Sequence, residues 1–279
     1  MSLDRPTRQS ASYVRGSTGA CFRLVTEPLD AAVRGTVLWA HPFAEEMNKT
    51  RRMCARMARL LASRGWRVVQ TDLSGCGDSS GEFRDANWQA WVEDMAGELE
   101  QVEALEPCWL WGVRAGALFA SELTALRKDL NLLLWQPALQ GSLVLQQFLR
   151  LHAGARIVGA TPKPTGDDQA SPAQRLKAGQ TVEVGGYEIS PALATGLQRA
   201  TFDPAPDYRG RVLWLELSAA QPPVLSAPSR DAIQRLQQRG VHVVHETVAG
   251  PMFWQTQEIE DCDALLQRSI DLIAEASPA

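Results

Sequence analysis

The chain has 279 residues, of which 45% are hydrophobic and 22% charged, a globular composition that excludes collagen-like, disordered and membrane-spanning classes. Its 28 basic and 32 acidic residues give a net charge of −4, so no overall positive field attracts nucleic acid or an anionic membrane. No apolar run reaches the roughly 20 residues that cross a bilayer, and residues 1–19 lack the apolar centre of a signal peptide. We therefore expect a cytoplasmic protein without a membrane span.

Short apolar runs alternate along the chain with longer stretches of helical period. The strand candidates are 36–40, 66–72, 108–112, 131–135, 211–217 and 241–246. The helix candidates are 49–64, 86–105, 115–127, 142–152, 229–239 and 255–274. This alternation is typical of strand–helix units around a mostly parallel sheet. Because the strand runs are apolar throughout, the sequence predicts an α/β fold whose sheet is covered on both faces by helices.

The order of these elements divides the chain into three parts. They are a flexible polar tail at 1–20, a core made of 21–136 and 210–279, and an insertion at 137–209. The insertion is too long for a simple crossover. It contains a Pro/Gly/Asp-rich linker at 161–172 and the run TVEVGGYEI at 181–189, whose paired glycines favour a β-hairpin. We expect a lid over the carboxyl edge of the sheet; a decorative or oligomer-forming insertion is the alternative.

Two of the predicted helices carry lopsided charge. The helix at 49–64 is basic, and the helix at 255–274 is acidic. We expect the two helices to lie side by side and to pair exposed charges with little net effect on stability. A basic helix that binds a membrane or an acidic partner is the alternative.

Three segments follow predicted strands, at the sheet edge where open α/β sheets bind ligands. They read LWAHPF at 38–43, DLSGCGDSSG at 72–81 and LWGVRAGA at 110–117. In order and spacing they resemble the α/β-hydrolase superfamily over about 36–134. The resemblance implies the α/β-hydrolase fold and makes the third segment the nucleophile elbow, a tight turn that exposes the nucleophile above a helix N-terminus.

The position of the nucleophile is occupied by Arg114. A guanidinium stays protonated and has no acceptor lone pair, so it acts neither as nucleophile nor as general base. Loss of a serine nucleophile alone lowers turnover on the order of a millionfold. The sequence therefore predicts no ordinary esterase activity.

The other two triad positions are also vacant. The segment where the resemblance places the acid, 218–224, contains no carboxylate, and Glu216 lies inside the predicted strand. The segment where it places the histidine, 247–254, contains Met252 but no histidine. His245 is the nearest imidazole, and its apolar surroundings predict a packed side chain within the strand.

An anion pocket is still expected at this edge. The amides of Ala115, at a helix N-terminus, and of Phe43 match the oxyanion-hole positions, and helix N-termini attract anions. Arg114 adds a forked donor suited to a carboxylate or phosphate. In the resembled superfamily the first loop, which here carries His41, shapes the same hole. A small acyl or anionic ligand is thus expected at these four residues.

The alternative is that Arg114 makes an internal ion pair that fills the old site, because a charge in a cleft is normally paired. The candidate carboxylates are Glu45, Glu46 and Asp72.

Other chemistries have weaker support. A thiolate–imidazole pair of Cys76 and His41 would be a non-standard catalytic site. The five cysteines are scattered and lack C-x-x-C spacing, so we expect reduced, buried thiols and no metal site. The glycines at 75–81 do not fit G-x-G-x-x-G and open no helix, so no dinucleotide or other cofactor is expected. Tryptophans in the predicted strands are interpreted as core: Trp39, Trp109, Trp111, Trp135 and Trp214.

The run HPFAEEMNK at 41–49, the elbow without serine and the run GPMFWQ at 250–255 are together similar to the exosortase A system-associated hydrolase 2 family. The resemblance spans most of the chain. It implies a bacterial context of exosortase and PEP-CTERM surface-protein sorting, usually near exopolysaccharide genes. It implies no particular reaction, because these proteins are called hydrolases by their fold.

Three functional hypotheses follow. The leading one is an α/β-hydrolase-fold protein with a degenerate triad that binds an acyl or anionic ligand or serves as an accessory component. The second is an active acyl-ester or thioester hydrolase with a non-standard nucleophile. The third, an oligomeric scaffold, predicts a wide apolar surface on the insertion.

Overall fold

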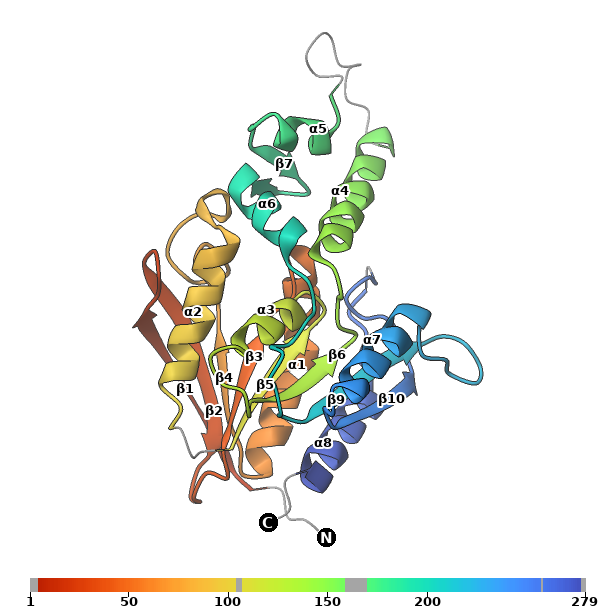
Figure 1. The fold of residues 1–279 in the computed structure, drawn as a ribbon. Helices are drawn as coiled ribbons and strands as arrows, with labels where there is room; N and C mark the ends of the chain where they lie inside the picture. The colour runs from red at the N-terminus through yellow and green to blue at the C-terminus, as the bar shows by residue number, and fades with distance from the viewer. Residues whose placement is uncertain (1–4, 104–106, 159–169, 257, 277–279) are drawn as a thin grey trace.

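The structure is a computed structural model that describes residues 5–103, 107–158, 170–256 and 258–276. One eight-stranded sheet has the order β1-β2-β4-β3-β5-β6-β9-β10. Its strands are β1 (Thr7–Arg15), β2 (Ala20–Pro28), β3 (Thr36–Ala40), β4 (Arg67–Thr71), β5 (Cys108–Val113), β6 (Asn131–Trp135), β9 (Val212–Ser218) and β10 (Val243–Ala249). From β4 to β10 neighbouring strands are parallel, whereas β1 and β2 form an antiparallel hairpin at one edge (Figure 1).

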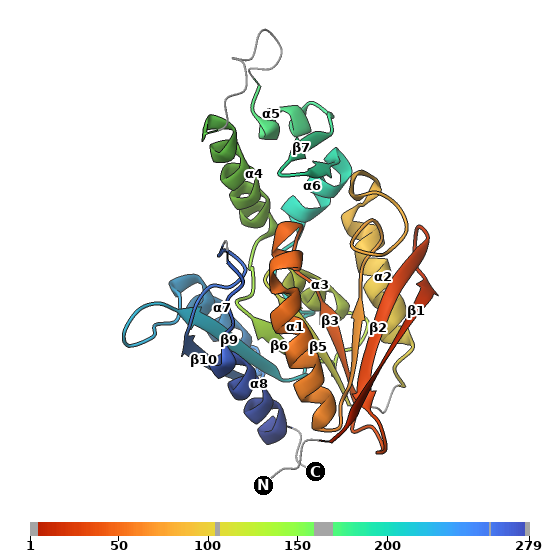
Figure 2. The same ribbon diagram turned by 180° about the vertical axis from the view of Figure 1, so that it is seen from behind.

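Helices cover both faces of the sheet. One face carries α1 (Glu45–Ser63) and α8 (Asp263–Ala276), which lie in front in Figure 2. The other carries α2 (Trp88–Glu100), α3 (Gly116–Leu123) and α7 (Ala227–Gln238) (Figure 1). The strand tryptophans are buried between these layers, namely Trp39, Trp109, Trp111, Trp135 and Trp214. The predicted covered, mostly parallel α/β sheet is therefore confirmed, as are the core tryptophans.

The predicted flexible tail at 1–20 is wrong for its middle part. Thr7–Arg15 is strand β1, which pairs along its whole length with β2. Most side chains of β1 are exposed, on both faces of the hairpin. The strand therefore lacks the apolar alternation that predicts a half-buried strand from sequence. Its extended conformation is held by the backbone hydrogen bonds to β2.

The pairing of the basic and acidic helices is confirmed. Arg52 of α1 contacts Asp261, just before α8, at 2.8 Å. Arg56 contacts the same carboxylate at 3.1 Å and Asp263 at 2.7 Å. The basic face of α1 is thus partly neutralised by the segment that begins α8.

The insertion stands on the end of the sheet (Figure 1). Its described elements are α4 (Gly141–Val158), α5 (Pro172–Lys177), β7 (Val182–Val184), β8 (Tyr187–Ile189) and α6 (Pro191–Arg199). β7 and β8 pair antiparallel around Gly185 and Gly186, whose φ angles of 60° and 82° favour glycine. Most of the expected linker, 161–169, lies outside the described residues.

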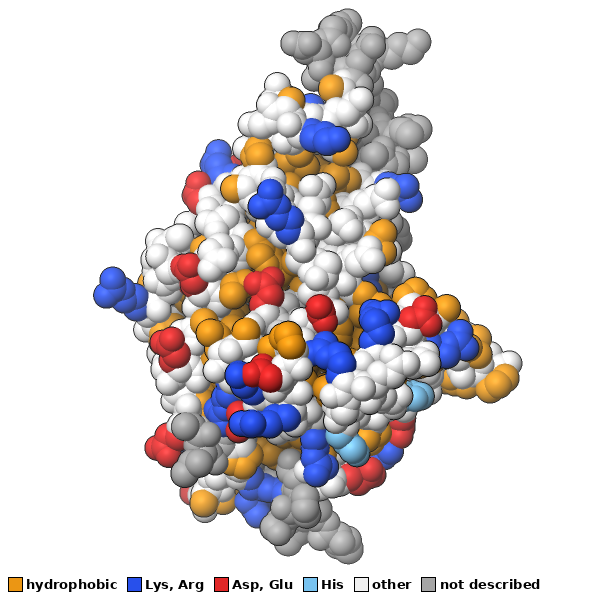
Figure 3. All heavy atoms as spheres, viewed as in Figure 1, with side chains coloured by type: hydrophobic (Ala, Val, Ile, Leu, Met, Phe, Trp, Pro, Cys, Tyr) orange, Lys and Arg blue, Asp and Glu red, His pale blue; other side chains and the backbone are white. Residues whose placement is uncertain are grey.

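The surface shows no single-sign charge field on the face drawn in Figure 3, where acidic and basic side chains are interspersed. Of the exposed large hydrophobic side chains in the described ranges, only Leu143 belongs to the insertion. This part of the insertion therefore gives no support to the scaffold hypothesis. No helix among the described residues combines the length and apolarity that a bilayer crossing requires.

Candidate functional site

The turn between β5 and α3 has the geometry of a nucleophile elbow. Arg114, at its tip, adopts a φ of 53°, in the left-handed region. A Cβ on Gly116 would lie 1.9 Å from the carbonyl oxygen of Ala40, at the end of β3. A Cβ on Gly112 would lie 2.9 Å from the backbone of Ala117. Glycine at both positions lets β3, β5 and α3 pack this closely.

The Arg114 side chain is held by an acidic and an aromatic partner. Its Nε and Nη2 donate to Oε1 of Glu46, at 3.2 Å and 3.1 Å. Its guanidinium carbon lies 5.3 Å from the ring centroid of Trp254, a cation–π contact. The side chain is only 12% exposed. The internal ion pair expected as the alternative is thus present.

Of the three candidate carboxylates, only Glu46 pairs with Arg114. Asp72 binds Arg51 at 3.0 Å, and Glu45 lies 3.2 Å from Lys49 within α1. Glu46 stands in the first turn of α1, where a negative charge is favoured by the helix dipole. No sequence pattern predicted the Trp254 contact, because that residue comes from the distant loop after β10.

Of the two oxyanion-hole positions, Ala115 follows Arg114 directly, and the carbonyl of Phe43 accepts a hydrogen bond from the amide of Glu46, the ion-pair partner of Arg114. Ala115 precedes α3 and is buried. Phe43 precedes α1, and its ring packs edge-on against Phe83 at 5.9 Å and Phe148 at 5.3 Å. Because both side chains are buried, only their backbone amides are suited to meet a ligand.

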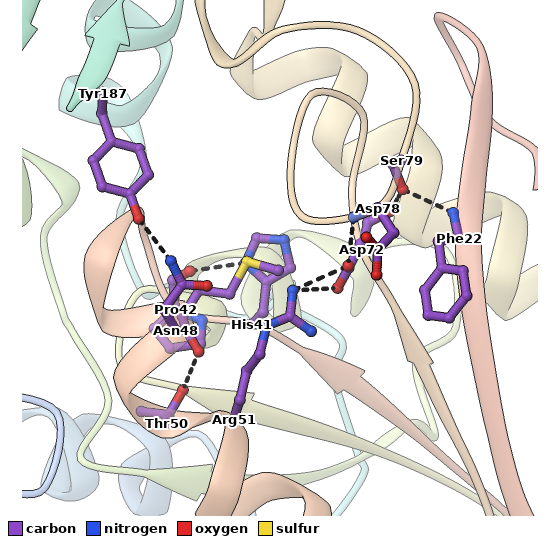
Figure 4. A network of polar contacts seen from close by, with 11 residues as sticks. Phe22, His41, Pro42, Asn48, Thr50, Arg51, Asp72, Asp78, Ser79 and Tyr187 are labelled. Carbon is purple, nitrogen blue, oxygen red and sulfur yellow. Dashed lines mark hydrogen bonds and ion pairs between the residues drawn. The ribbon is translucent and has the colours of Figure 1, made fainter. Parts of the chain in front are cut away.

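An aromatic cluster of Phe43, Phe83, Phe148 and Tyr187 joins the insertion to this edge of the sheet. The Tyr187 ring, on β8, lies 5.0 Å from Phe83 and 6.0 Å from Phe148. Its hydroxyl oxygen accepts a hydrogen bond from the Asn48 amide of α1 at 3.0 Å (Figure 4). The hairpin therefore rests on the residues that surround the elbow.

His41 is buried in the core rather than open to a ligand. Its Nδ1 lies 2.8 Å from the carbonyl oxygen of Pro42, and its Nε2 is buried without a hydrogen-bond partner among the described residues. Its ring packs against Trp39 and Trp91, with centroids 5.7 Å and 6.1 Å away. Burial lowers the pKa of His41, so its imidazole is held neutral.

Cys76 is an unsuitable nucleophile. The thiol is buried, and burial raises its pKa, with the nearby Asp72 charge raising it further. A thiol with a raised pKa supplies almost no thiolate, the reactive form. The other four cysteines are also buried and form no disulfide, as predicted. A catalytic thiolate–imidazole pair is therefore disfavoured.

The glycine-rich loop after β4 is braced by Asp72 (Figure 4). This carboxylate is buried and receives both Arg51 Nη2, at 3.1 Å and 3.0 Å, and the Asp78 amide, at 3.0 Å. Ser79 accepts a hydrogen bond from the Phe22 amide at 2.8 Å. These contacts fix the loop, and the Ser79 hydroxyl donates to the backbone carbonyl of Asp72 and not to a catalytic base.

The remaining triad positions have no catalytic group. Glu216 is buried and accepts hydrogen bonds from the Trp214 indole at 3.2 Å and the Ser226 amide at 3.1 Å. Ser226 is the N-cap residue of α7, so the carboxylate connects β9 to the start of that helix. Met252 is 36% exposed in the loop after β10. The packed side chain predicted for His245 is wrong: it is exposed, because β10 is the edge strand of the sheet.

No cluster of three or more His, Cys, Asp or Glu side chains suited to a metal ion occurs within the described ranges. The site thus offers an arginine, two amides and aromatic surface. The guanidinium and the backbone amides are hydrogen-bond donors, and none of these groups is a nucleophile.

Comparison with solved structures gives matches along nearly the whole chain. The monoglyceride lipase of Saccharomyces cerevisiae is 11% identical, with a TM-score of 0.64 and coverage of 99% of this chain and 98% of that one. Est1E of Butyrivibrio proteoclasticus, solved with ferulic acid, is 12% identical, with a TM-score of 0.61 and coverage of 95% and 98%. An α/β serine hydrolase homologue of Coxiella burnetii is 15% identical, with a TM-score of 0.54 and coverage of 95% and 97%.

At such low identity these likenesses show the fold alone. No curated protein sequence matches the chain. A family model described as serine aminopeptidase, S33 matches residues 31–170, which include the elbow, the loop after β3 and the start of the insertion. Together with the elbow geometry, this match shows that the chain belongs to the serine aminopeptidase S33 (Hydrolase_4) family of α/β-hydrolase-fold proteins.

Proposed function

We propose that this protein is a non-catalytic member of its family that binds a ligand with an anionic head group and an acyl chain. The observation that carries the proposal is Arg114, which stands at the tip of the elbow and is paired with Glu46. A guanidinium supplies neither a nucleophile nor a base, so what remains of the site is its capacity to bind.

The guanidinium has donors to spare for a ligand. Glu46 takes its Nε and Nη2, while Nη1 lies 3.5 Å from the carbonyl oxygen of Gln136, at the limit of a hydrogen bond. A ligand carboxylate approaching from the edge of the sheet meets this donor and the amide of Ala115 at the start of α3. Arg114 is thus suited to the head group.

The acyl part of the proposal rests on the aromatic cluster. The Phe83 and Tyr187 rings are partly exposed where the core meets the insertion, and an alkyl chain packs favourably on such a surface. The insertion then acts as a lid, because Tyr187 is its contact with α1 through Asn48.

Calorimetric titration with decanoate, which has a carboxylate and an apolar chain, tests this proposal. Arg114→Ala weakens binding roughly tenfold or more, the size expected for a lost charge-assisted hydrogen bond. Glu46→Gln strengthens binding, because it removes the internal competitor for Arg114. The matched control is Arg230→Ala, which removes an exposed arginine on α7 and leaves binding unchanged. Equal binding by wild type and Arg114→Ala contradicts the proposal.

The absence of catalysis is tested separately with short- and long-chain esters and thioesters. We expect no turnover above buffer for wild type, Arg114→Ala or Cys76→Ala. Turnover by wild type that is abolished in Cys76→Ala overturns the proposal and favours the alternative, a hydrolase with a non-standard nucleophile. Turnover that both substitutions leave unchanged points to a contaminant, and activity that separates from this protein on further purification identifies it.

We also propose a cytoplasmic accessory role in exosortase-dependent protein sorting. The support is the similarity of the runs at 41–49 and 250–255, with the serine-free elbow, to the exosortase A system-associated hydrolase 2 family. Deletion of the gene in its host, followed by measurement of PEP-CTERM protein at the cell surface, tests this role. Unchanged sorting in the deletion strain contradicts it.

A further inference from the structure

Within the part of the chain that the structure describes, strand β1 leaves one side of its backbone unpaired. It is an edge of the sheet and pairs only with β2 among the residues described (red in Figure 1). Flanking its nine residues, the carbonyl of Pro6 accepts from the Leu29 amide at 2.9 Å, and the Gly16 amide donates to Gly19 at 2.7 Å. Hydrogen-bonded pairs alternate along an antiparallel ladder, so the even-numbered residues of β1 bond to β2. The odd-numbered residues therefore direct their N–H and C=O groups outward.

This free edge lacks the usual protection against pairing. Its register with β2 runs from Thr7 to Arg15 without a bulge. Residues 7–15 contain no proline, lysine or acidic residue. The two charges, Arg8 and Arg15, are near the ends, and the Arg8 guanidinium is bound by Glu27 of β2 at 2.7 Å. Bulges, prolines and inward charges are what keep edge strands of monomeric proteins apart.

The sequence of β1 is complementary to itself in one antiparallel register, centred on Ala11. In this register the outward-facing pairs are Ala11 with Ala11, Gln9 with Tyr13 and Thr7 with Arg15, and the pairs between them are Ser10 with Ser12 and Arg8 with Val14. Every residue whose backbone groups face outward thus meets another such residue. No two like charges stand opposite each other, which would be destabilising.

We propose that two copies of this chain pair through β1 about a two-fold axis at Ala11, joining their sheets into one continuous sheet. The interface is isologous, as is usual for two-fold dimers. Tyr13, which is 65% exposed and packs edge-on against Phe22 at 5.8 Å, becomes covered by the Gln9 side of the partner. The dimer leaves the elbow free, because β1 lies at one edge of the sheet and three strands separate it from β5.

Light scattering coupled to size-exclusion chromatography measures the mass in solution. Wild type gives twice the 30.6 kDa of one chain, and the dimer dissociates on dilution. Ala11→Pro gives a monomer with unchanged circular dichroism, because the lost amide faces outward and no bond to β2 is broken. A wild type that stays monomeric at its highest soluble concentration, or an Ala11→Pro variant that stays dimeric, overturns the proposal.

Cysteine cross-linking tests the register. All five native cysteines are buried, so an introduced surface thiol reacts alone. Ala11→Cys forms an intermolecular disulfide on mild oxidation, since directly opposed Cα atoms lie about 5.5 Å apart. Gln9→Cys does not cross-link by itself, but a mixture of Gln9→Cys and Tyr13→Cys does. Cross-linking of Gln9→Cys alone, without Ala11→Cys, contradicts this pairing.

Discussion

Arg114 combines a strained backbone conformation with a side chain that is not a nucleophile. A φ of 53° costs a non-glycine residue roughly 1–2 kcal/mol. Its amide donates to the carbonyl of Trp135 at 3.0 Å, and its carbonyl accepts from the Ala138 amide at 2.9 Å. These bonds to the end of β6 involve no side-chain atom of residue 114. The backbone of the elbow therefore forms independently of the side chain at its tip. That side chain determines only the chemistry of the site.

Gly116→Ala is expected to lower the free energy of unfolding by at least ~3 kcal/mol, the upper range for overpacking. The added Cβ meets the backbone oxygen of Ala40 at 1.9 Å, and neither strand nor helix yields easily. The control is Gly97→Ala in α2, where nothing lies within 4 Å of the new Cβ. That change adds ~0.5–1 kcal/mol through helix propensity. Urea unfolding measures both, and equal effects would contradict the packing argument.

His41 predicts a loss of stability in mild acid. Burial lowers the pKa of this imidazole in the folded protein, whereas the unfolded chain takes up its proton near pH 6.5. The stabilising contribution is thus complete above that pH and is lost as the pH falls below it. The loss is at most ~1.4 kcal/mol per pH unit.

Urea unfolding between about pH 7.5 and 5.5 measures this slope. His41→Gln is less stable at neutral pH, because the packed ring is lost, but its stability falls less on acidification than that of wild type. Parallel slopes for wild type and His41→Gln would show that His41 does not titrate on unfolding.

At the scale of elements, Tyr187 of the β7–β8 hairpin makes two kinds of contact with the core, in addition to the burial of Val182, Val184 and Ile189. The Tyr187 ring packs on Phe83 and Phe148, and its hydroxyl meets Asn48. Arg84 adds an exposed ion pair to Glu188 at 3.3 Å, which contributes little. The aromatic packing is therefore expected to hold the hairpin in place.

Tyr187→Ala is expected to speed hydrogen exchange of the β7–β8 amides strongly, while Tyr187→Phe changes it little. The second substitution removes only the exposed hydrogen bond to Asn48, worth about 1 kcal/mol. Exchange followed by mass spectrometry compares the hairpin with β6, whose buried amides serve as the internal reference. Equal exchange in both variants would assign the attachment to the hydroxyl instead of the ring.

The sequence predicted those elements whose signal is local. β3 and β6 occupy the predicted 36–40 and 131–135, because a buried parallel strand is a short, wholly apolar run. β1 was missed because both its faces are exposed. α8 begins at Asp263, later than the predicted 255, since the acidic residues before it have helix propensity but no apolar period. In both places tertiary contacts, and not a local pattern, determine the secondary structure.

The residues of the candidate site were likewise predicted only where a local motif pointed to them. Arg114 was found from the spacing of its motif, and Glu46 was one of three carboxylates in reach. The contacts of Trp254 and Tyr187 come from segments more distant in the chain, which no local pattern connects to the elbow.

For the whole molecule, α1 and α8 join the N-terminal and C-terminal parts of the core. Their charge pairs are exposed, with Arg52 61% and Asp261 25% accessible. Arg52 also lowers the pKa of Asp261 by a direct hydrogen bond, so the pair weakens when acid protonates that carboxylate. Beneath the charges, α8 buries an apolar face that includes Leu265 and Ile273. Apolar burial is the larger effect, because exposed ion pairs are screened and cost side-chain entropy.

We therefore expect Leu265→Ala to destabilise the protein by ~3 kcal/mol, the middle of the range for buried leucine truncation. Asp261→Asn is expected to have little or no effect, and less still in high salt, where the Debye length is short. Thermal unfolding of both variants at low and high ionic strength makes the comparison. If Asp261→Asn lowered the midpoint as much as Leu265→Ala at low salt, the charge pairs and not the apolar face would hold the two parts of the core together.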